Sequence, residues 1–262
     1  MRVKGLCASI LSWGLLVLAA PAGAANLVYL GGPVVRSAKA VDIFWGPSFA
    51  NPASPDYFYA QRLILFRNQF GTNPEYNIIT QYYQIVGGVK QHIQLSNLAA
   101  GTPDWFDTST PPTNVTDADA QAEVRRYLAT HAFDASTIYE IFLPSTSYSS
   151  FGGGTSCGGP QLAFCAYHNF TSGTTSALYT VQPYASCSAC QVAGWTADQN
   201  QERNVAYATR STVVNPHFNS WYDPSGNTGD DLCGWTPPPF LDGGFGYPYD
   251  WSNAAHGCVR TR

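Results

Sequence analysis

The sequence predicts an α+β (mixed α/β) fold, a single domain with a central mixed sheet and an irregular C-terminal part stapled by disulfides. Two observations carry this prediction. Apolar runs of strand length alternate with segments of helical spacing as far as about residue 214, an order typical of a sheet covered by helices. From Asn215 onwards, glycine, proline and aromatic residues dominate, which favours turns and short strands.

The two clearest strands are apolar runs. Ala40–Trp45 (AVDIFW) is followed at once by a glycine and a proline, and Thr137–Leu143 (TIYEIFL) is rich in β-branched and aromatic residues. Three weaker patterns complete the expected sheet. They are the alternating stretch His92–Leu98 and the short runs Phe164–His168 and Ala177–Val181.

Three segments are predicted to be helices. The first is Pro55–Phe70, which has apolar residues near helical spacing and Gly71 as its stop. The second is capped at its start and spans Thr116–His131, and the third spans Thr196–Val213. Tyr76–Tyr83 (YNIITQYY) fits either a helix or a strand.

The first 24 residues are predicted to be a signal peptide. Arg2 and Lys4 form the positive start, Ile10–Ala20 is a short apolar run, and Ala22–Ala24 is a small-residue cleavage site. A membrane-spanning helix needs about 20 apolar residues, so this run is too short to remain as an anchor. Residues 25–262 are then expected to be one secreted domain, extracellular or periplasmic.

Composition excludes several function classes. The chain has a formal net charge of −4, only 11% charged residues and no basic cluster, so it lacks an electrostatic footprint for nucleic acid or a membrane surface. The glycine-rich stretch Gly152–Pro160 lacks the Lys-Ser/Thr ending of a phosphate-binding loop, and we predict a flexible lid or turn there. We expect no cofactor and a monomeric protein.

Six cysteines remain after cleavage, and an even number in an exported chain indicates disulfides. Proximity along the chain predicts the pairs Cys157–Cys165, Cys187–Cys190 and Cys233–Cys258. Cys187-Ser-Ala-Cys190 also fits a thioredoxin-like redox pair, but the residues after it make a poor helix start. A zinc knuckle is disfavoured because the chain has no second Cys-x-x-Cys.

Several short blocks of the chain, taken in order, resemble the Exordium or phosphate-induced-protein family. The blocks are Tyr29–Val35, Val41–Gly46, Cys165–His168, Cys187–Cys190, Asn215–Asp223, Gly229–Trp235 and Trp251–Val259. Each block is short, but together they run through nearly all of the expected mature chain. The resemblance implies a secreted protein. Plant members of that family are associated with growth and cell expansion and have no settled biochemical activity.

Many bacterial members of that family carry Ser-His-Glu-x-x-Glu-Ala just before the block equivalent to Asn215–Asp223. That motif resembles the metal-binding helix of zincins, and the predicted element order is also similar to that of zincins. In this chain Tyr207 stands for the histidine, Ala208 for the first glutamate and Ser211 for the second. None of these side chains supplies the zinc chemistry, and Arg210 adds a positive charge there. The chain resembles a bacterial-type relative that lacks the His-Glu-x-x-Glu motif, and no metal site is expected.

We therefore predict a secreted, non-catalytic protein that binds a cell-surface or cell-wall partner, carbohydrate above all. The expected stacking platforms are Trp221, Tyr222, Trp235 and Trp251. Packing around a Cys233–Cys258 bridge would also account for these aromatic residues.

The alternative is a secreted zincin-like metallohydrolase with a displaced or degenerate metal site. Its candidate ligands or acid–base groups are His168, His217, Asp223 and Asp230. Asp223 also fits a turn or helix cap, and Asp230-Asp231 fits a solvated or calcium-type loop. No Gly-x-Ser-x-Gly elbow supports a serine triad. Asn114 and Asn169 begin Asn-x-Thr sequences, which are glycosylation acceptors in a eukaryotic secretory pathway.

Overall fold

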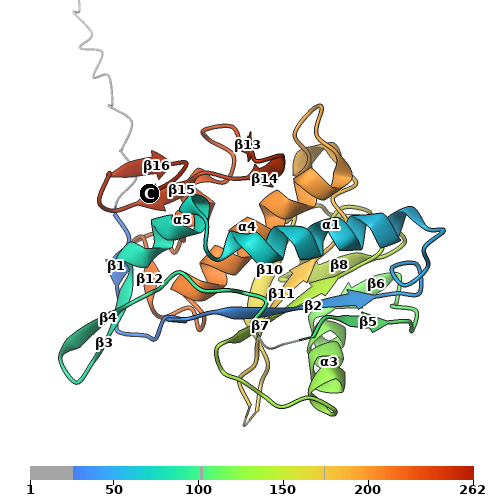
Figure 1. Cartoon of the computed structure of the whole chain (residues 1–262), viewed down its shortest axis with the longest axis horizontal. Helices are drawn as coiled ribbons and strands as arrows, with labels where there is room; N and C mark the ends of the chain where they lie inside the picture. The colour runs from blue at the N-terminus through green and yellow to red at the C-terminus, as the bar shows by residue number, and fades with distance from the viewer. Residues whose placement is uncertain (1–25, 101–102, 174) are drawn as a thin grey trace, which may run out of the picture.

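The computed structural model describes residues 26–100, 103–173 and 175–262 (Figure 1). The predicted signal peptide, residues 1–24, lies outside the described residues. Within the described part of the chain, no helix combines the length and the apolar character needed to cross a bilayer.

A five-stranded mixed sheet forms the centre of the fold, in the order β10-β11-β7-β2-β5. Its strands are β2 (Lys39–Trp45), β5 (Trp105–Asp107), β7 (Thr137–Phe142), β10 (Tyr167–Phe170) and β11 (Leu178–Gln182). The pairs β11–β7, β7–β2 and β2–β5 are parallel, and β10 pairs with β11 antiparallel. The predicted α+β class with a mixed sheet is confirmed.

Three long helices cover the two faces of the sheet (Figure 1). The helices α1 (Pro55–Phe70) and α4 (Ala197–Val214) lie on one face, and α3 (Asp117–Leu128) lies on the other. Phe44 and Phe142 of the sheet share a buried cluster with Phe66 of α1, whereas the opposite face buries Ile43 against α3. Alternate residues of β2 therefore enter different cores, because successive side chains of a strand point to opposite faces.

Local signals determine the helix boundaries. Ser54 caps α1 by accepting a hydrogen bond from Asp56 N, and Pro55 occupies the first turn. Thr116 and Thr196 each form a capping box with the residue three positions later, at the starts of α3 and α4. Each cap satisfies backbone N–H groups that have no partner inside the helix.

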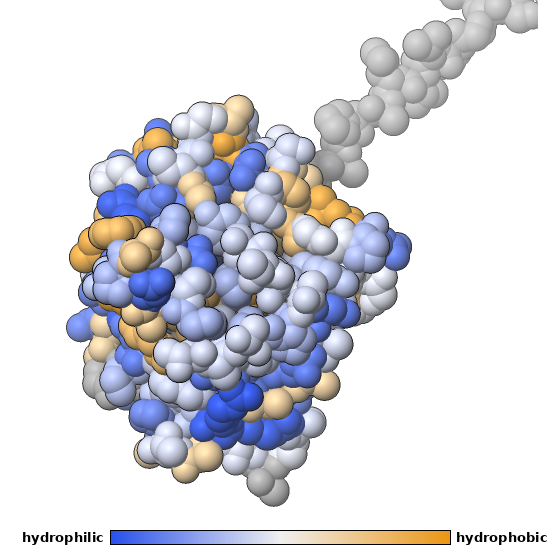
Figure 2. Space-filling view, turned by 90° about the vertical axis from the view of Figure 1, so that its right-hand side faces the viewer, coloured by the Kyte–Doolittle hydropathy of each residue, from blue (hydrophilic) through white to orange (hydrophobic). Residues whose placement is uncertain are grey.

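Short elements surround this framework. They are β1 (Val28–Tyr29), α2 (Pro74–Asn77), η1 (Ile78–Gln81), β3 (Tyr83–Val86), β4 (Val89–His92), β6 (Asn114–Thr116), β8 (Tyr148–Phe151), β9 (Gly154–Thr155), η2 (Ser188–Cys190), β12 (Trp221–Tyr222), α5 (Gly229–Cys233), β13 (Phe240–Asp242), β14 (Phe245–Tyr247), β15 (Asp250–Ser252) and β16 (Gly257–Val259). Figure 2 shows one face of the molecule, on which separate apolar patches lie among neutral and hydrophilic residues.

The structure corrects two of the predicted elements. His92–Leu98 is not a strand, because β4 ends at His92 and the following backbone bonds to scattered partners, such as Gln94 N to Arg36 O. Ile93 and Leu98 are nonetheless buried, which produced the apolar pattern. The predicted loop Gly152–Pro160 contains β9, which pairs with β8 across Gly152 and Gly153.

The six cysteines form three disulfides, but two of the predicted pairings are wrong. Cys233–Cys258 is confirmed, whereas the other bridges are Cys157–Cys187 and Cys165–Cys190. The pairing is determined by tertiary structure and not by proximity along the chain. The segments around residues 157–165 and 187–190 lie side by side and bury their sulfurs in one small cluster, so each cysteine bonds across the contact. Cys187-Ser-Ala-Cys190 is therefore not a redox pair within one turn.

A candidate binding cavity beside the third long helix

Helix α4 positions the groups of the candidate site. It carries Tyr207, Ala208 and Ser211, the three residues compared above with a metal-binding motif. Arg210, on the same turn, has no exposed surface. The side chains around this turn divide into a closed cluster around Arg210 and an open cavity further towards the helix N-terminus.

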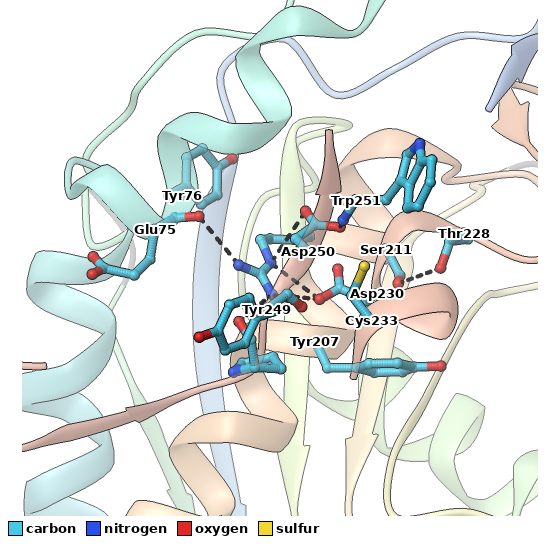
Figure 3. Close-up of polar contacts among 12 residues, drawn as sticks. Glu75, Tyr76, Tyr207, Ser211, Thr228, Asp230, Cys233, Tyr249, Asp250 and Trp251 are labelled. Carbon is cyan, nitrogen blue, oxygen red and sulfur yellow. Dashed lines mark hydrogen bonds and ion pairs between the residues drawn. The ribbon is translucent and has the colours of Figure 1, made fainter. Parts of the chain in front are cut away.

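The closed cluster surrounds the Arg210 guanidinium with acceptors, and Figure 3 labels Glu75, Asp230, Tyr249 and Asp250 among the residues that supply them. Its Nη2 donates to Asp230 Oδ1 at 2.5 Å, and its Nε lies 3.6 Å from Asp250 Oδ2. Its Nη1 donates to the backbone carbonyl of Glu75 at 3.2 Å, and Nη2 also reaches that of Pro248 at 3.2 Å. This arginine is therefore paired on every side.

Burial dominates the electrostatics of this cluster. It raises the pKa of Asp230 well above its usual value and also raises the pKa of Asp250, while the charge of Arg210 opposes both shifts. The guanidinium supplies the positive charge that these two carboxyl groups need. It fills the space between them with a fixed cation, which leaves no place there for a metal ion.

An open cavity of about 400 Å³ lies next to this cluster. One wall carries Arg203, Asn204 and Tyr207 of α4, and another carries Asp230 and Asp231 of α5 with the indole of Trp235. The remaining wall is the segment 162–166 together with the Cys165–Cys190 disulfide. Segments far apart in the sequence thus converge on one hollow.

Arg203 is the unusual group of this cavity. Its side chain is only 2% exposed, and its guanidinium carbon lies 3.8 Å from the centre of the Trp235 ring. Nη2 donates to Asn204 Oδ1 at 2.6 Å and to the carbonyl of Cys190 at 3.3 Å. Burial lowers the pKa of Arg203 to about 10, so it is still a cation at neutral pH.

Tyr207 and Asp231 form a polar edge of the same cavity. The Tyr207 hydroxyl donates to Asp231 Oδ1, and Asp231 Oδ2 accepts from Thr228 N at 2.7 Å and Thr228 Oγ1 at 2.8 Å. Burial, followed by the charge of Asp231, raises the pKa of Tyr207 well above its usual value. The phenol therefore stays protonated, and the Asp231 carboxylate is held by three hydrogen bonds.

A second, smaller cavity of about 210 Å³ shares Ala166, Tyr207 and Asp231 with the first. His168 lines it, with its ring 4.7 Å from that of Phe218. Burial lowers the pKa of His168 to about 4, so its imidazole is neutral at pH 7. Its Nδ1 is buried and has no hydrogen-bond partner among the described residues.

The four predicted ligand or acid–base residues do not converge. His168 lies in the smaller cavity, and His217 packs edge-on against Phe170 at 4.9 Å. Asp223 makes a turn, as its alternative interpretation predicts, by accepting from Ser225 N and Asn227 N at 2.8 Å each. Asp230 pairs with Arg210.

The Asp230-Asp231 pair is also corrected. It is not a solvated or calcium-type loop, because both residues lie in the first turn of α5 and Asp230 is buried. Across residues 26–100, 103–173 and 175–262, the only grouping with metal-ligand spacing is Cys157, Cys187 and Cys190. These sulfurs belong to disulfides, so they are not the thiolates that bind zinc.

The four predicted aromatic platforms have different environments. Trp221 and Trp251 are buried, and their indole nitrogens donate to Tyr83 O and Asn253 Oδ1. Tyr222 is half-buried in β12. Trp235 is 46% exposed and lines the larger cavity, so it is the one aromatic platform of the four placed to meet a ligand.

Sequence reasoning missed Arg203, Asn204, Tyr207 and Asp231 as cavity residues. The one available signal was spacing, since Arg203 and Tyr207 are four residues apart and so share a helix face. In the sequence, Arg203 follows the acidic residue Glu202, which suggests a neighbouring ion-pair partner. In the structure Glu202 pairs with Arg62 instead.

No family model, no curated protein and no solved structure matches this chain. The resemblance to the Exordium family therefore remains a prediction from the sequence blocks.

Proposed function

We propose that this protein is a secreted, non-catalytic member of the Exordium-like family that binds cell-surface or cell-wall carbohydrate in the cavity beside α4. The observation that carries the proposal is Trp235, an exposed indole on the wall of a cavity that also holds charged and polar side chains. Sugar rings present apolar C–H faces and hydroxyl edges, so an indole beside hydrogen-bonding side chains complements them.

The cavity offers polar groups of the kind that hydroxyls require. The Asn204 side chain contributes an amide, and Tyr207 and Asp231 contribute a phenol and a carboxylate at the rim. A volume of about 400 Å³ lies within the usual size range of small-ligand sites. These features favour a sugar or short oligosaccharide over a purely apolar ligand.

Export is supported by the disulfides and by the predicted signal peptide. Three bridges hold the described part of the chain together, and such bridges persist in oxidising compartments. We propose an extracellular or periplasmic location after cleavage near residue 24.

The alternative function, a metallohydrolase, has less support. A displaced zinc site needs three or four nitrogen, oxygen or sulfur ligands around one point. Its proposed residues are instead engaged separately, Asp223 by its own turn, Asp230 by Arg210 and His217 by an aromatic ring. We therefore favour binding over hydrolysis.

A glycan array probed with the purified mature protein tests the proposal. We expect the wild type to bind a subset of glycans, Trp235→Ala to lose that binding while it still unfolds cooperatively in denaturant, and Phe58→Ala to keep it. Phe58 is a matched control because it is an aromatic residue 67% exposed on α1, outside the cavity. One zinc per chain together with peptide or glycan cleavage would instead support the hydrolase.

A further inference from the structure

Three arginines of the described chain are buried, and two of them face carboxylates. Arg67 lies 3.4 Å from Asp42 and also pairs with Asp104, and Arg210 pairs with Asp230 and Asp250. The third, Arg203, forms no ion pair with any of the described residues. It is also the one of the three that lines the larger cavity.

The nearest acid in the sequence does not neutralise Arg203. Glu202 is on the adjacent position of α4, where it accepts from Arg62 Nε at 2.9 Å and from Gly246 N at 2.8 Å. Asp231 is on the rim of the cavity, but its oxygens are taken by Tyr207 and Thr228. The positive charge of Arg203 is therefore left without a counter-ion.

On the wall of the cavity formed by α4, the buried polar atoms that lack a hydrogen-bond partner in the described structure are donors. Arg203 Nε and Asn204 Nδ2 are buried nitrogen atoms without a partner in the described structure. Both groups only donate, and buried donors are normally satisfied. A cation with free donors beside it is complementary to a ligand that carries negatively charged acceptor oxygens.

We propose that the larger cavity binds the carboxylate of an acidic sugar, a uronate, and that Arg203 is the residue that pairs with it. This inference rests on the proposed carbohydrate function and names the class of sugar. The Trp235 ring covers one face of the guanidinium, and Nη2 already donates to Asn204 Oδ1 and the Cys190 carbonyl. The hydrogen bonds to a ligand carboxylate therefore come from the other guanidinium nitrogens. Asn204 adds its free amide donor, and the exposed indole surface packs against the sugar ring.

Isothermal titration of the full mature protein tests this assignment. The probes are a galacturonic acid oligosaccharide, its carboxyl-reduced neutral counterpart and a sulfated galactan oligosaccharide of the same length. We expect the wild type to bind the galacturonate at least tenfold more tightly than the neutral sugar, with the preference shrinking as salt is raised.

The variants separate charge recognition from folding. Arg203→Met is expected to abolish the preference while the neutral sugar still binds, and Arg203→Lys, which keeps the charge but lacks the planar fork, is expected to keep only part of it. Arg125→Met is the matched control, because Arg125 is exposed on α3 outside this cavity. Trp235→Ala is expected to weaken both sugars. A cooperative denaturant unfolding transition establishes that each variant is folded.

The outcomes distinguish this inference from the proposed function. Equal binding of the acidic and neutral sugars by the wild type, or a preference that survives in Arg203→Met, overturns the role of Arg203 but leaves carbohydrate binding intact. Tighter binding of the sulfated sugar would overturn the carboxylate assignment in favour of a tetrahedral anion. No binding of any sugar would overturn both proposals.

Discussion

Arg203 and Arg210 lie two turns apart on α4, and their surroundings differ in one respect. Each is almost completely buried, with exposed fractions of 2% and 0%. Arg210 faces two carboxylates and three backbone carbonyls, whereas Arg203 faces one carbonyl, one amide oxygen and an indole. The two arginines are equally buried, so burial does not distinguish them. They differ in whether the protein places carboxylates beside them, which makes Arg210 a structural residue and Arg203 a candidate for binding a ligand.

The difference also has an energetic meaning. Burying an ion costs several kcal/mol, and only well-placed partners offset that cost. At Arg210 the protein supplies the partners itself. At Arg203 the cost is retained in the free protein, which is the situation expected where a ligand completes the site.

Replacing Arg210 should therefore have the largest effect. Arg210→Met leaves Asp230 and Asp250 buried without a cation, and breaking a buried pair in this way costs about 3–5 kcal/mol. We expect the free energy of unfolding to fall by that amount in chemical denaturation at pH 7. Asp230→Asn/Asp250→Asn/Arg210→Met removes all the charges together and is expected to recover part of the loss. A loss below about 1 kcal/mol for Arg210→Met alone would contradict the paired description.

The disulfides allow a matched test of the two sides of α4. Cys233–Cys258 holds α5 beside Arg210, and Cys165–Cys190 forms a wall of the cavity beside Arg203. Each bridge spans a sequence separation of 25, so the loop-closure contribution, about 3 kcal/mol, is the same. Replacing each pair by alanine should cost about this much. The two losses should be similar, because each bridge joins one fully buried cysteine, Cys233 or Cys190, to a half-buried one.

Clearly unequal losses for the two bridges in denaturant titrations would contradict this expectation and show that the packing around one bridge adds to loop closure. Sugar binding gives the second readout. It should suffer more in the Cys165→Ala/Cys190→Ala variant, whose bridge lines the cavity.

Sequence and structure agree where the determinants are local. The predicted first helix, Pro55–Phe70, matches α1 because its boundaries are set locally, by a capping serine and a proline at its start and a glycine directly after its end. The strand predicted at Thr137–Leu143 matches β7 to within one residue. Two disulfides were paired wrongly because each of their cysteines has a nearer cysteine along the chain, and only the folded contact between the two segments selects the true partner.

The cavity could not be predicted from the sequence either, because it too depends on contacts between segments that are far apart in the chain. Whether Arg203 is paired depends on where Glu202 and Asp231 point after folding. Glu202 accepts a hydrogen bond from Arg62 of α1, and Asp231 accepts hydrogen bonds from Tyr207 and Thr228. No spacing rule within α4 contains that information. Tyr207, Ala208 and Ser211 came into consideration only through the family resemblance, and that resemblance says nothing of the cavity beside them.

His168, which lines the smaller cavity, should make the free energy of unfolding depend on pH. Burial lowers its pKa from 6.5 to about 4, so the unfolded chain takes up a proton at a higher pH than the folded one. Stability from neutral His168 is therefore present above pH 6.5 and is lost as the pH falls towards 4. After allowance for its partial exposure, we expect about 1–2 kcal/mol.

The comparison variant is His168→Gln, whose side chain does not titrate. Denaturant midpoints of wild type and variant should converge as the pH falls from 6.5 to 4. The difference between the two proteins isolates this residue from Glu123, whose pKa burial raises to about 8 and whose contribution is lost in the opposite direction, as the pH rises. Parallel curves would contradict the prediction, because they would show that the pKa of His168 is the same in the folded and the unfolded chain.

The smallest expected change in the free energy of unfolding comes from replacing Arg203. A small change here, set against the large one at Arg210, would distinguish an arginine without a carboxylate partner from a structural one. Arg203→Met removes a buried cation that has no carboxylate partner, so the loss of its two hydrogen bonds and its contact with Trp235 is offset by the removal of the desolvation cost. We expect a free energy of unfolding within about 1 kcal/mol of the wild type, or above it. A loss as large as that of Arg210→Met would mean that Arg203 is a structural ion like its neighbour. A neutral effect on folding, combined with loss of preference for an acidic sugar, requires that the partner of this arginine comes from outside the chain.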